Sequence, residues 1–282
     1  MSGARGGRRQ NNWDLRAAGN FIGGGTGTGL AVVAAAEAFT GGTFRAALAL
    51  GLVLTGAGLG LVWLEIGRPW RAINVFFHPR TSWMTREGIM ALLLFPLGIL
   101  ALALGEAWLA LAAAVAAVAF LSCQAGILHA ARAIPAWRKN ELVPLILAAG
   151  LAEGTGLALC VPGTEPFVVL LALAAGFARE IAWGVYRGAL AEEKRTQAAL
   201  AAFEERPARV ARAAQWASLA LLVLAAALSV PALAMAGGAL AFLGGAAIKA
   251  VLITRAGYKQ RVALPAVPVR GGGGRANPAS AR

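Results

Sequence analysis

The chain has 282 residues, of which 59% are hydrophobic, and its 26 Lys and Arg residues against 13 Asp and Glu give a net charge of +13. Soluble domains are about 45–50% apolar, so the composition excludes an ordinary water-soluble domain. So basic a chain could also bind nucleic acid. Here, however, the cations are spread over loops beside apolar runs, so we expect no nucleic-acid partner and attribute them to topology and anionic lipid head groups.

Eight apolar runs follow a short polar start, and each approaches the roughly 20 residues that a helix needs to cross the hydrocarbon core. The predicted spans are 17–39, 46–66, 88–104, 108–128, 142–161, 167–186, 213–230 and 234–253. They predict an all-α integral membrane protein with eight transmembrane helices in a membrane domain at residues 17–255. Because the turns on one side are short, successive spans should be antiparallel neighbours, which favours two groups of four helices.

The distribution of positive charge predicts the orientation of the chain. All Lys and Arg residues except Arg45 lie in or beside every second gap between the apolar runs. Loops rich in Lys and Arg stay in the cytoplasm. We therefore expect a multi-pass protein of the bacterial inner membrane with residues 1–16, loops 67–87 and 187–212, and the tail 256–282 all cytoplasmic.

Two of these cytoplasmic segments have a composition of their own. Loop 187–212 alternates charged with small apolar residues, which is typical of an interfacial amphipathic helix. The tail is rich in Gly and Pro and is predicted to be disordered. Seven Trp and Tyr residues near the inner boundary, among them Trp137, Trp183 and Tyr186, are expected to form an aromatic belt against the lipid.

The first span contains the run GGGTGTG at residues 23–29. This run has the composition of a phosphate-binding loop but lacks its Lys, its spacing and a preceding strand. Small residues four apart allow a second helix to approach closely, and Thr hydroxyls can bond back to the helix. Tight helix packing is the main expectation, and a locally unwound segment facing a ligand is the alternative.

The Cys and His residues offer no metal site. Cys123 lies near the inner end of one span and Cys160 near the outer end of the next, so about 20 Å or more of depth excludes a disulfide. A haem would need two His residues facing one another across helices, whereas His78 lies in a loop and His129 ends a span. We expect no haem or metal in this chain.

The densest set of chemically capable residues is the segment 65–87, EIGRPWRAINVFFHPRTSWMTRE. Ser82 or Thr85 can cap the following helix, and Glu87 would then lie in its first turn, where the helix dipole favours a carboxylate. This segment places acids, cations, a His and aromatic rings around two helix ends. Such a set suits a quinone, a polar ring whose carbonyl oxygens take up protons when the ring takes up electrons. A charged loop beside lipid head groups is the plainer alternative.

Two segments carry a resemblance to a known family: NWDLRAAGNF at residues 12–21 with the Gly/Thr run, and GRPWRA with RTSWMTRE in the loop. They resemble the membrane-anchor subunits of molybdopterin oxidoreductases, of the dimethyl sulfoxide reductase anchor type, related to the polysulfide and nitrite reductase anchors. Within that family the likeness is greatest to the branch of phenylacetyl-CoA:acceptor oxidoreductase. The specific part covers roughly residues 12–90, and beyond it the likeness rests on hydropathy.

The resemblance implies a function. In that family the anchor has no redox metal; it holds a four-cluster iron–sulfur subunit and a molybdopterin catalytic subunit at the membrane and houses a site for the quinone pool. Gly67, Arg71 and Glu87 match positions linked to quinol binding. The dimethyl sulfoxide reductase branch has a His where this chain has Glu65, so Glu65, Glu87 and His78 are alternatives for the proton-handling group. Since the matching loop is cytoplasmic by the charge pattern, the soluble subunits are expected to dock from the cytoplasm, where CoA thioesters are found.

Several charges fall inside the predicted spans, and intramembrane ionisable groups are functional suspects because of their cost. Glu153 is either neutral and bonded to a neighbouring helix or part of a proton path with Arg179 and Glu180. Those two project about 100° apart on a helix, so different partners are expected. Lys249 is predicted to snorkel to the interface, and Glu37 to be a solvated acid at a helix end.

Two other functions remain open. Eight spans and Glu153 near mid-depth would permit a small-molecule or proton-coupled transporter, and the Gly-rich span could be its broken helix. A purely structural anchor without a ligand is the third possibility. A transporter should concentrate polar groups at the midplane, whereas here they gather at the cytoplasmic rim, which favours the quinone interpretation.

Overall fold

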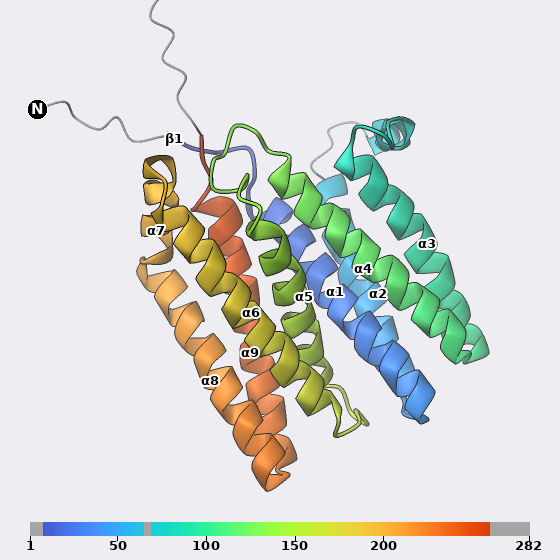
Figure 1. Ribbon diagram of the computed structural model, residues 1–282. Coiled ribbons are helices and arrows are strands. Elements are labelled where there is room, and N and C mark those ends of the chain that lie inside the picture. Colours follow the sequence, from blue (N-terminus) through green and yellow to red (C-terminus); the bar gives the residue numbers. More distant parts are fainter. Residues whose placement is uncertain (1–7, 65–68, 260–282) are drawn as a thin grey trace, which may run out of the picture.

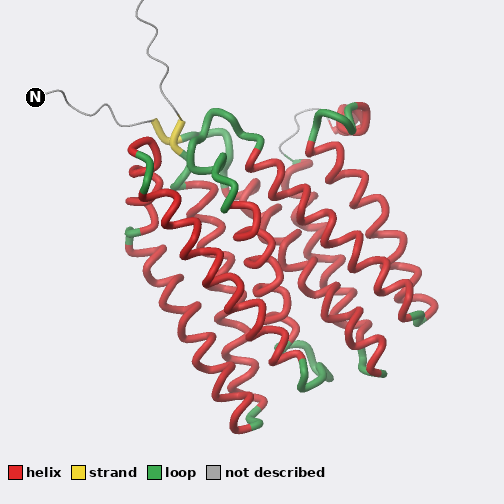
Figure 2. Tube along the Cα trace, viewed as in Figure 1, coloured by secondary structure: helices red, strands yellow, loops and turns green. Residues whose placement is uncertain are grey.

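Long helices joined by short loops make up nearly all of the described chain (Figures 1 and 2). The computed structural model describes residues 8–64 and 69–259, and for residues 8 and 69–72 only the backbone. Seven described helices are long and apolar enough to cross a membrane: α1 (Leu15–Thr40), α2 (Phe44–Trp63), α3 (Trp83–Leu104), α4 (Ala107–His129), α6 (Val168–Ala191), α8 (Arg206–Leu228) and α9 (Pro231–Thr254). An eighth apolar helix, α5 (Leu142–Ala158), has 17 residues. The chain is therefore helical, as expected of a multi-pass membrane protein.

The remaining described elements are short. They are the strands β1 (Arg8–Arg9) and β2 (Tyr258–Lys259), the 3-10 helices η1 (Pro69–Phe77) and η2 (Lys194–Thr196), and the helix α7 (Gln197–Phe203). Strand β1 pairs antiparallel with β2, so the two ends of the described chain meet at the same end of the helices (Figure 1). Loop 187–212 contains less independent structure than predicted, because α6 continues to Ala191 and α8 already begins at Arg206. The short 3-10 helix η2 and the helix α7 lie between them, and Phe203 of α7 is buried against the core.

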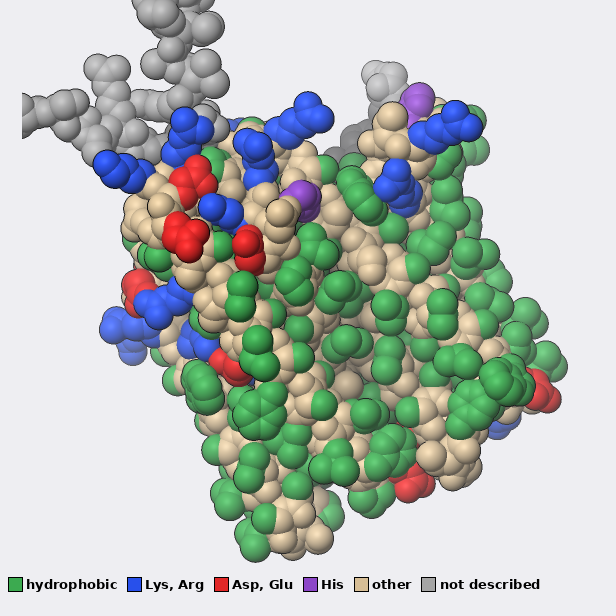
Figure 3. All heavy atoms as spheres, in the orientation of Figure 1, with side chains coloured by type: hydrophobic (Ala, Val, Ile, Leu, Met, Phe, Trp, Pro, Cys, Tyr) green, Lys and Arg blue, Asp and Glu red, His purple; other side chains and the backbone are tan. Residues whose placement is uncertain are grey.

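Most of the described charged side chains gather at one end of the molecule (Figure 3). We call this the basic end; it comprises residues 8–16, 73–86, 130–141, 187–206 and 255–259. The opposite end consists of the tight turns at residues 41–43, 105–106, 159–167 and 229–230. Each long helix runs from one end to the other (Figure 2).

The starts of α1 and α3 follow from their capping residues. Asp14 accepts a hydrogen bond from Arg16 N at 2.8 Å, and the Arg16 side chain beside it holds the pKa of Asp14 below its usual value. Ser82 Oγ accepts from Thr85 N at 3.3 Å, so Ser82 is the predicted cap of α3. Because α3 begins at Trp83, it starts five residues before the predicted span.

Helix α1 lies at the centre and packs against α2, α4, α5 and α9 (Figure 1). Its glycines permit this: a Cβ added to Gly29 would lie 2.7 Å from Gly154 Cα of α5. Thr28 Oγ1 donates to Gly24 O and to Ala117 O of α4, each at 2.9 Å. The tight-packing prediction is confirmed, and since α1 is helical throughout, the unwound alternative is wrong.

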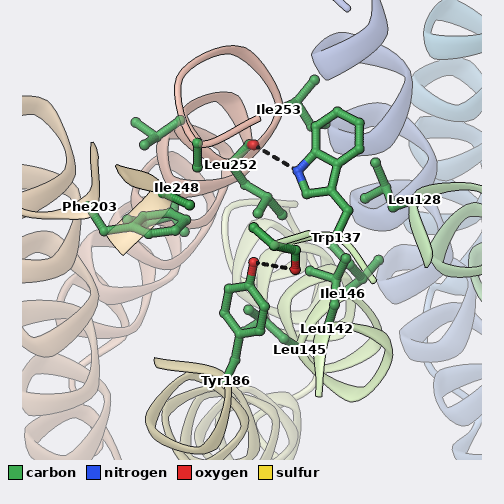
Figure 4. Packing of buried hydrophobic residues seen from close by; sticks show 14 of the residues in the cluster. Leu128, Trp137, Leu142, Leu145, Ile146, Tyr186, Phe203, Ile248, Leu252 and Ile253 are labelled. Carbon is green, nitrogen blue, oxygen red and sulfur yellow. Dashed lines mark hydrogen bonds between the residues drawn. The ribbon is translucent and has the colours of Figure 1, made fainter. Parts of the chain in front are cut away.

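The apolar core forms two clusters along the helix axes. One, in the half toward the basic end, includes Trp137 and Tyr186 (Figure 4), and the other, in the opposite half, includes Leu30 and Leu48. Trp137 Nε1 donates to Leu252 O, and Tyr186 Oη donates to Ala136 O, each at 3.2 Å. Both rings are fully buried, so assigning them to a lipid-facing belt was wrong; their polar atoms find partners within the protein.

Candidate functional site

A cavity of about 260 Å³ lies at the basic end, among the first four long helices. It is lined by Asn12, Trp13, Ala17, Asn20, Phe21, Val62, Met84, Glu87 and Ile127. These residues come from the first turns of α1 and the segment before it, the last turn of α2, the start of α3 and the last turn of α4. We call it the Glu87 pocket. It joins residues from both segments that carry the family resemblance.

Glu87 is buried, with 5% of its surface exposed. It lies beyond the first turn of α3, not in that turn as predicted, because the helix starts at Trp83. Two amides donate to the same carboxylate oxygen: Asn20 Nδ2 to Oε1 at 3.3 Å and Gln124 Nε2 to Oε1 at 3.0 Å. The carboxyl group is therefore held by helices α1 and α4 while it lines the pocket.

The amide of Gln124 reaches α1 because Gly24 has no side chain. A Cβ at Gly24 would lie 2.6 Å from Gln124 Nε2, and that nitrogen also donates to Asn20 O at 3.1 Å. Among the described residues, Asn20 Oδ1 and Gln124 Oε1 are buried without a hydrogen-bond partner. Such atoms are uncommon in protein interiors. The pocket thus combines the carboxyl group of Glu87 with an unpartnered acceptor, Asn20 Oδ1, while Gln124 holds Glu87 from behind the lining.

An indole ring forms one wall of the pocket. Trp13 stacks on Phe21 with centroids 5.9 Å apart and meets Trp137 edge-on at 5.0 Å. Buried Gln10 fixes its backbone: Gln10 Oε1 accepts from Trp13 N at 2.7 Å, and Gln10 Nε2 donates to Trp13 O at 2.8 Å and to Ile253 O at 2.9 Å. The aromatic wall is therefore held in place before any ligand arrives.

The other residues predicted for the quinone site either lie away from the Glu87 pocket or fall outside the described residues. Glu65 and Gly67 lie outside the described residues, as does the side chain of Arg71. His78 is exposed in the turn after η1, where its carbonyl accepts from Ser82 N at 2.9 Å, and it does not line the Glu87 pocket. Of the predicted set, the structure brings Glu87 into the pocket.

A second polar cluster lies deep in the bundle, around Glu153. Lys249 Nζ lies 2.9 Å from Glu153 Oε2, and Thr26 Oγ1 donates to the same oxygen at 3.1 Å. Lys249 Nζ also donates to Phe21 O at 3.2 Å. Lys249 is 1% exposed, so the prediction that it snorkels to the interface was wrong. Gly25 leaves the space beside α1 that its ammonium group occupies.

A third cluster continues toward the basic end. Arg179 Nε lies 3.4 Å from Glu180 Oε1, so these neighbours contact each other. Each also has a separate partner, as expected: Arg179 Nη1 donates to Ala241 O at 3.4 Å, and Glu180 pairs with Arg212. Arg212 engages both oxygens of Glu180, with Nη1 to Oε1 at 3.0 Å, and stacks over Trp183 at 4.9 Å. A cavity of about 20 Å³, enough for one water molecule, lies between this cluster and Lys249.

At the opposite end, Glu37 is also buried. Its Oε1 accepts from Glu165 N at 3.1 Å, so it ties α1 to the loop before α6. The prediction of a solvated acid was therefore wrong. Cys123 and Cys160 are both unpaired, as predicted. Within residues 8–64 and 69–259, no three His, Cys, Asp or Glu side chains are grouped to hold a metal.

Sequence reasoning did not select Asn20 and Trp13, which line the pocket, or Gln124, which donates to Glu87. The amides were visible as polar residues within apolar runs, and Trp13 lies in the first resembling segment. Their convergence on Glu87 depends on the packing of α1 against α3 and α4, which no local pattern specifies.

No protein-family model matches the chain, and no curated protein matches its sequence. The case for a function therefore comes from the Glu87 pocket, the buried charges and the resemblance of the two segments.

Proposed function

We propose that this chain is the membrane-anchor and quinone-interacting subunit of a molybdopterin/iron–sulfur oxidoreductase. It passes electrons between an iron–sulfur subunit and the quinone pool. The observation that carries the proposal is the burial of Glu87 in a pocket with an aromatic wall, where Asn20 and Gln124 both donate to its Oε1. A carboxyl group so placed can exchange a proton with a carbonyl oxygen of a bound ring.

The pocket suits the head ring of a quinone. At about 260 Å³ it is slightly smaller than the roughly 300–1,000 Å³ of typical ligand sites, so it takes the ring while the isoprenoid tail extends into lipid. Trp13 and Phe21, which stack on each other, both line the pocket and give it an aromatic surface. Reduction of a quinone takes two electrons and two protons; the electrons come from the partner subunit, and Glu87 delivers one proton. Glu65, Arg71 and His78 of the adjoining loop remain candidates for the second proton and for ring contacts.

The proposal includes eight spans, with α5 as the eighth. Hydrogen bonds extend α5 by a further turn, from Leu159 N to Gly156 O, Cys160 N to Leu157 O and Val161 N to Ala158 O. The extended segment reaches about the 20 residues that a crossing requires. Pairing of β1 with β2 brings the two described ends of the chain to the same end of the helices, which supports an even number of crossings. The spans then form two groups of four, α1 to α4 and α5, α6, α8 and α9.

The basic end is assigned to the cytoplasm of a bacterial inner membrane by its excess of Lys and Arg. The four-cluster iron–sulfur subunit and the molybdopterin catalytic subunit dock there, on the side where the Glu87 pocket lies. Phenylacetyl-CoA:acceptor oxidoreductase is the complex that the resemblance favours. The chain itself is proposed to hold no haem or metal.

A transporter is the weaker candidate because its substrate would need space near mid-depth. The cavity beside Lys249 measures about 20 Å³, and Glu153 is fully buried in an ion pair. We keep Glu153, Arg179 and Glu180 as a proposed proton path, now with Lys249 between Glu153 and Arg179. The 20 Å³ cavity is the place where a water molecule would join the two clusters.

Titration of the purified full-length chain with a short-chain quinone tests the proposal, with tryptophan fluorescence as the readout. Glu87→Gln should weaken binding about tenfold, the loss expected for a hydrogen bond to a charged or protonated carboxyl group. Glu106→Gln, an exposed acid at the opposite end, is the matched control. Identical titration curves for the wild type and Glu87→Gln would remove Glu87 from the quinone site.

A further inference from the structure

A groove of about 830 Å³ runs along the outer face of the bundle between α6 and α8. The two helices touch at Gly176, where an added Cβ would lie 2.7 Å from Leu219 Cδ2. The groove lies on the basic-end side of this contact. It is separate from the Glu87 pocket, since none of its lining residues belongs to α1 to α4.

The depth of the groove matches one leaflet of a bilayer. Phe177 and Arg187, which both line it, are ten residues apart on α6, which corresponds to about 15 Å along the helix axis. That is about half of the 30 Å hydrocarbon core. Phe177 and Ile181 lie at the deep part and Arg187 at the part toward the basic end, and the Glu180–Arg212 ion pair, whose side chains are mostly buried, lies in the wall between the two helices.

The charges of the lining favour an anion. Two arginines and one glutamate line the groove, which leaves one positive charge in excess. Arg212 is already neutralised by Glu180. Arg187 pairs at 2.7 Å with Glu204, and both side chains are more than half exposed, so this ion pair is weak. Arg187 can therefore exchange Glu204 for a phosphate group. Trp216 of α8 is 56% exposed and lines the groove. It lies along α8 between Arg212, which pairs with Glu180, and Leu219, which faces Gly176, so it is at the deep part beside the path of an acyl chain.

Two glycines make the floor of the groove open. Nothing lies within 4 Å of a Cβ added at Gly184 or at Gly188, so neither glycine is required by packing within the described chain. Glycine in a helix interior costs about 1 kcal/mol relative to alanine. Both residues line the groove, which is consistent with a molecule from outside the chain lying against α6 at this point.

We propose that this groove binds one anionic phospholipid of the leaflet at the basic end. The phosphate lies against Arg187, and an acyl chain runs beside Gly184 and Ile181 to Phe177, with the exposed ring of Trp216 against its deeper part. The site does not depend on the quinone function, because it is built from α6 and α8 alone with Leu200 of α7 at its rim.

The test measures phospholipid retained by the full-length chain after purification in mild detergent and addition of phosphatidylglycerol, by native mass spectrometry. The wild type should hold one phosphatidylglycerol per chain. Arg187→Gln removes the phosphate contact, and Gly184→Leu fills the groove without a clash in the described chain; each should lower retention at least fivefold. Two control variants should retain the lipid. Arg209→Gln changes an exposed arginine one turn from Arg212 on α8, and Gly60→Leu changes a glycine of α2 whose added Cβ likewise meets no atom within 4 Å.

Equal retention by all variants would overturn the proposal, as would equal retention of phosphatidylcholine with the same acyl chains. Detection of a chain dimer that Gly184→Leu dissociates would show that a helix of a second copy occupies the groove instead. Competition by inorganic phosphate alone at millimolar concentration would show a free-anion site and also contradict a lipid site.

Discussion

Lys249 of α9 and Glu153 of α5 form an ion pair inside the bundle, with Nζ 2.9 Å from Oε2. Neither side chain is more than 2% exposed. The same ammonium group donates to Phe21 O of α1, so it joins three helices. A lone buried charge in lipid would be very costly, and each of these two residues is therefore tolerated only because of the other.

Removal of one partner should destabilise the fold more than removal of both. Glu153→Gln or Lys249→Met alone leaves an unpaired buried charge and should cost about 3–5 kcal/mol of unfolding free energy. The double variant should cost less than the sum of the two. Unfolding in mixed micelles measures each value, with Glu204→Gln, which breaks an exposed pair, as a control expected below about 1 kcal/mol. Additive costs would mean that the pair does not act as a unit.

Close packing at the α1 glycines gives a second prediction. A Cβ at Gly29 would lie 2.7 Å from Gly154 Cα and 2.8 Å from Gly150 O, which are backbone atoms that cannot rotate away. Gly29→Ala should therefore separate α1 from α5 and lower both the yield of folded protein and its thermal stability. Gly60→Ala is the matched control, because nothing lies within 4 Å of its added Cβ. Equal melting temperatures would show that α1 and α5 are less closely packed.

The sequence predicted the long helices, their approximate limits and the role of the Gly/Thr run, because hydropathy and small-residue spacing are local signals. It failed where the outcome depended on a distant partner. Lys249 lies close to a helix end, which favours snorkelling, yet 96 positions separate it from the carboxylate that holds it inside. Glu87 was selected from its loop, whereas Asn20 and Gln124, which bind it, lie 67 and 37 positions away.

Reporter fusions at the turns test the number of crossings. With the proposed eight spans, reporters placed at Gly105, Gly163 and Ser229 should all lie outside the cytoplasm. A reporter after Lys259 should lie inside, because eight crossings return the chain to the side of β1, which pairs with β2. If α5 does not cross, the reporters at Gly163 and Ser229 appear on the opposite side from the reporter at Gly105. Fusions within the long helices would be uninformative, so the turns are the sites to use.

The wall of the Glu87 pocket can be tested through its indole ring. Trp13→Ala removes the stacking surface beside Phe21 and should weaken short-chain quinone binding about tenfold, whereas Trp13→Phe should retain most of it. Because the variant itself removes a fluorophore, equilibrium dialysis of the quinone is the measurement. Trp108→Ala, an exposed ring at the opposite end, is the control. Unchanged binding in Trp13→Ala would mean that the ring does not line the quinone site.

The central claim, that this chain anchors an electron-transferring complex, is tested most directly by affinity purification of the tagged full-length chain from its native membranes. Iron, molybdenum and extractable quinone are then measured in the purified material. The account predicts that an iron–sulfur protein and a molybdopterin protein co-purify in stoichiometric amounts, with quinone present, and that Glu87→Gln keeps both proteins while reducing the quinone. A chain that purifies alone, without iron, molybdenum or quinone, would contradict it.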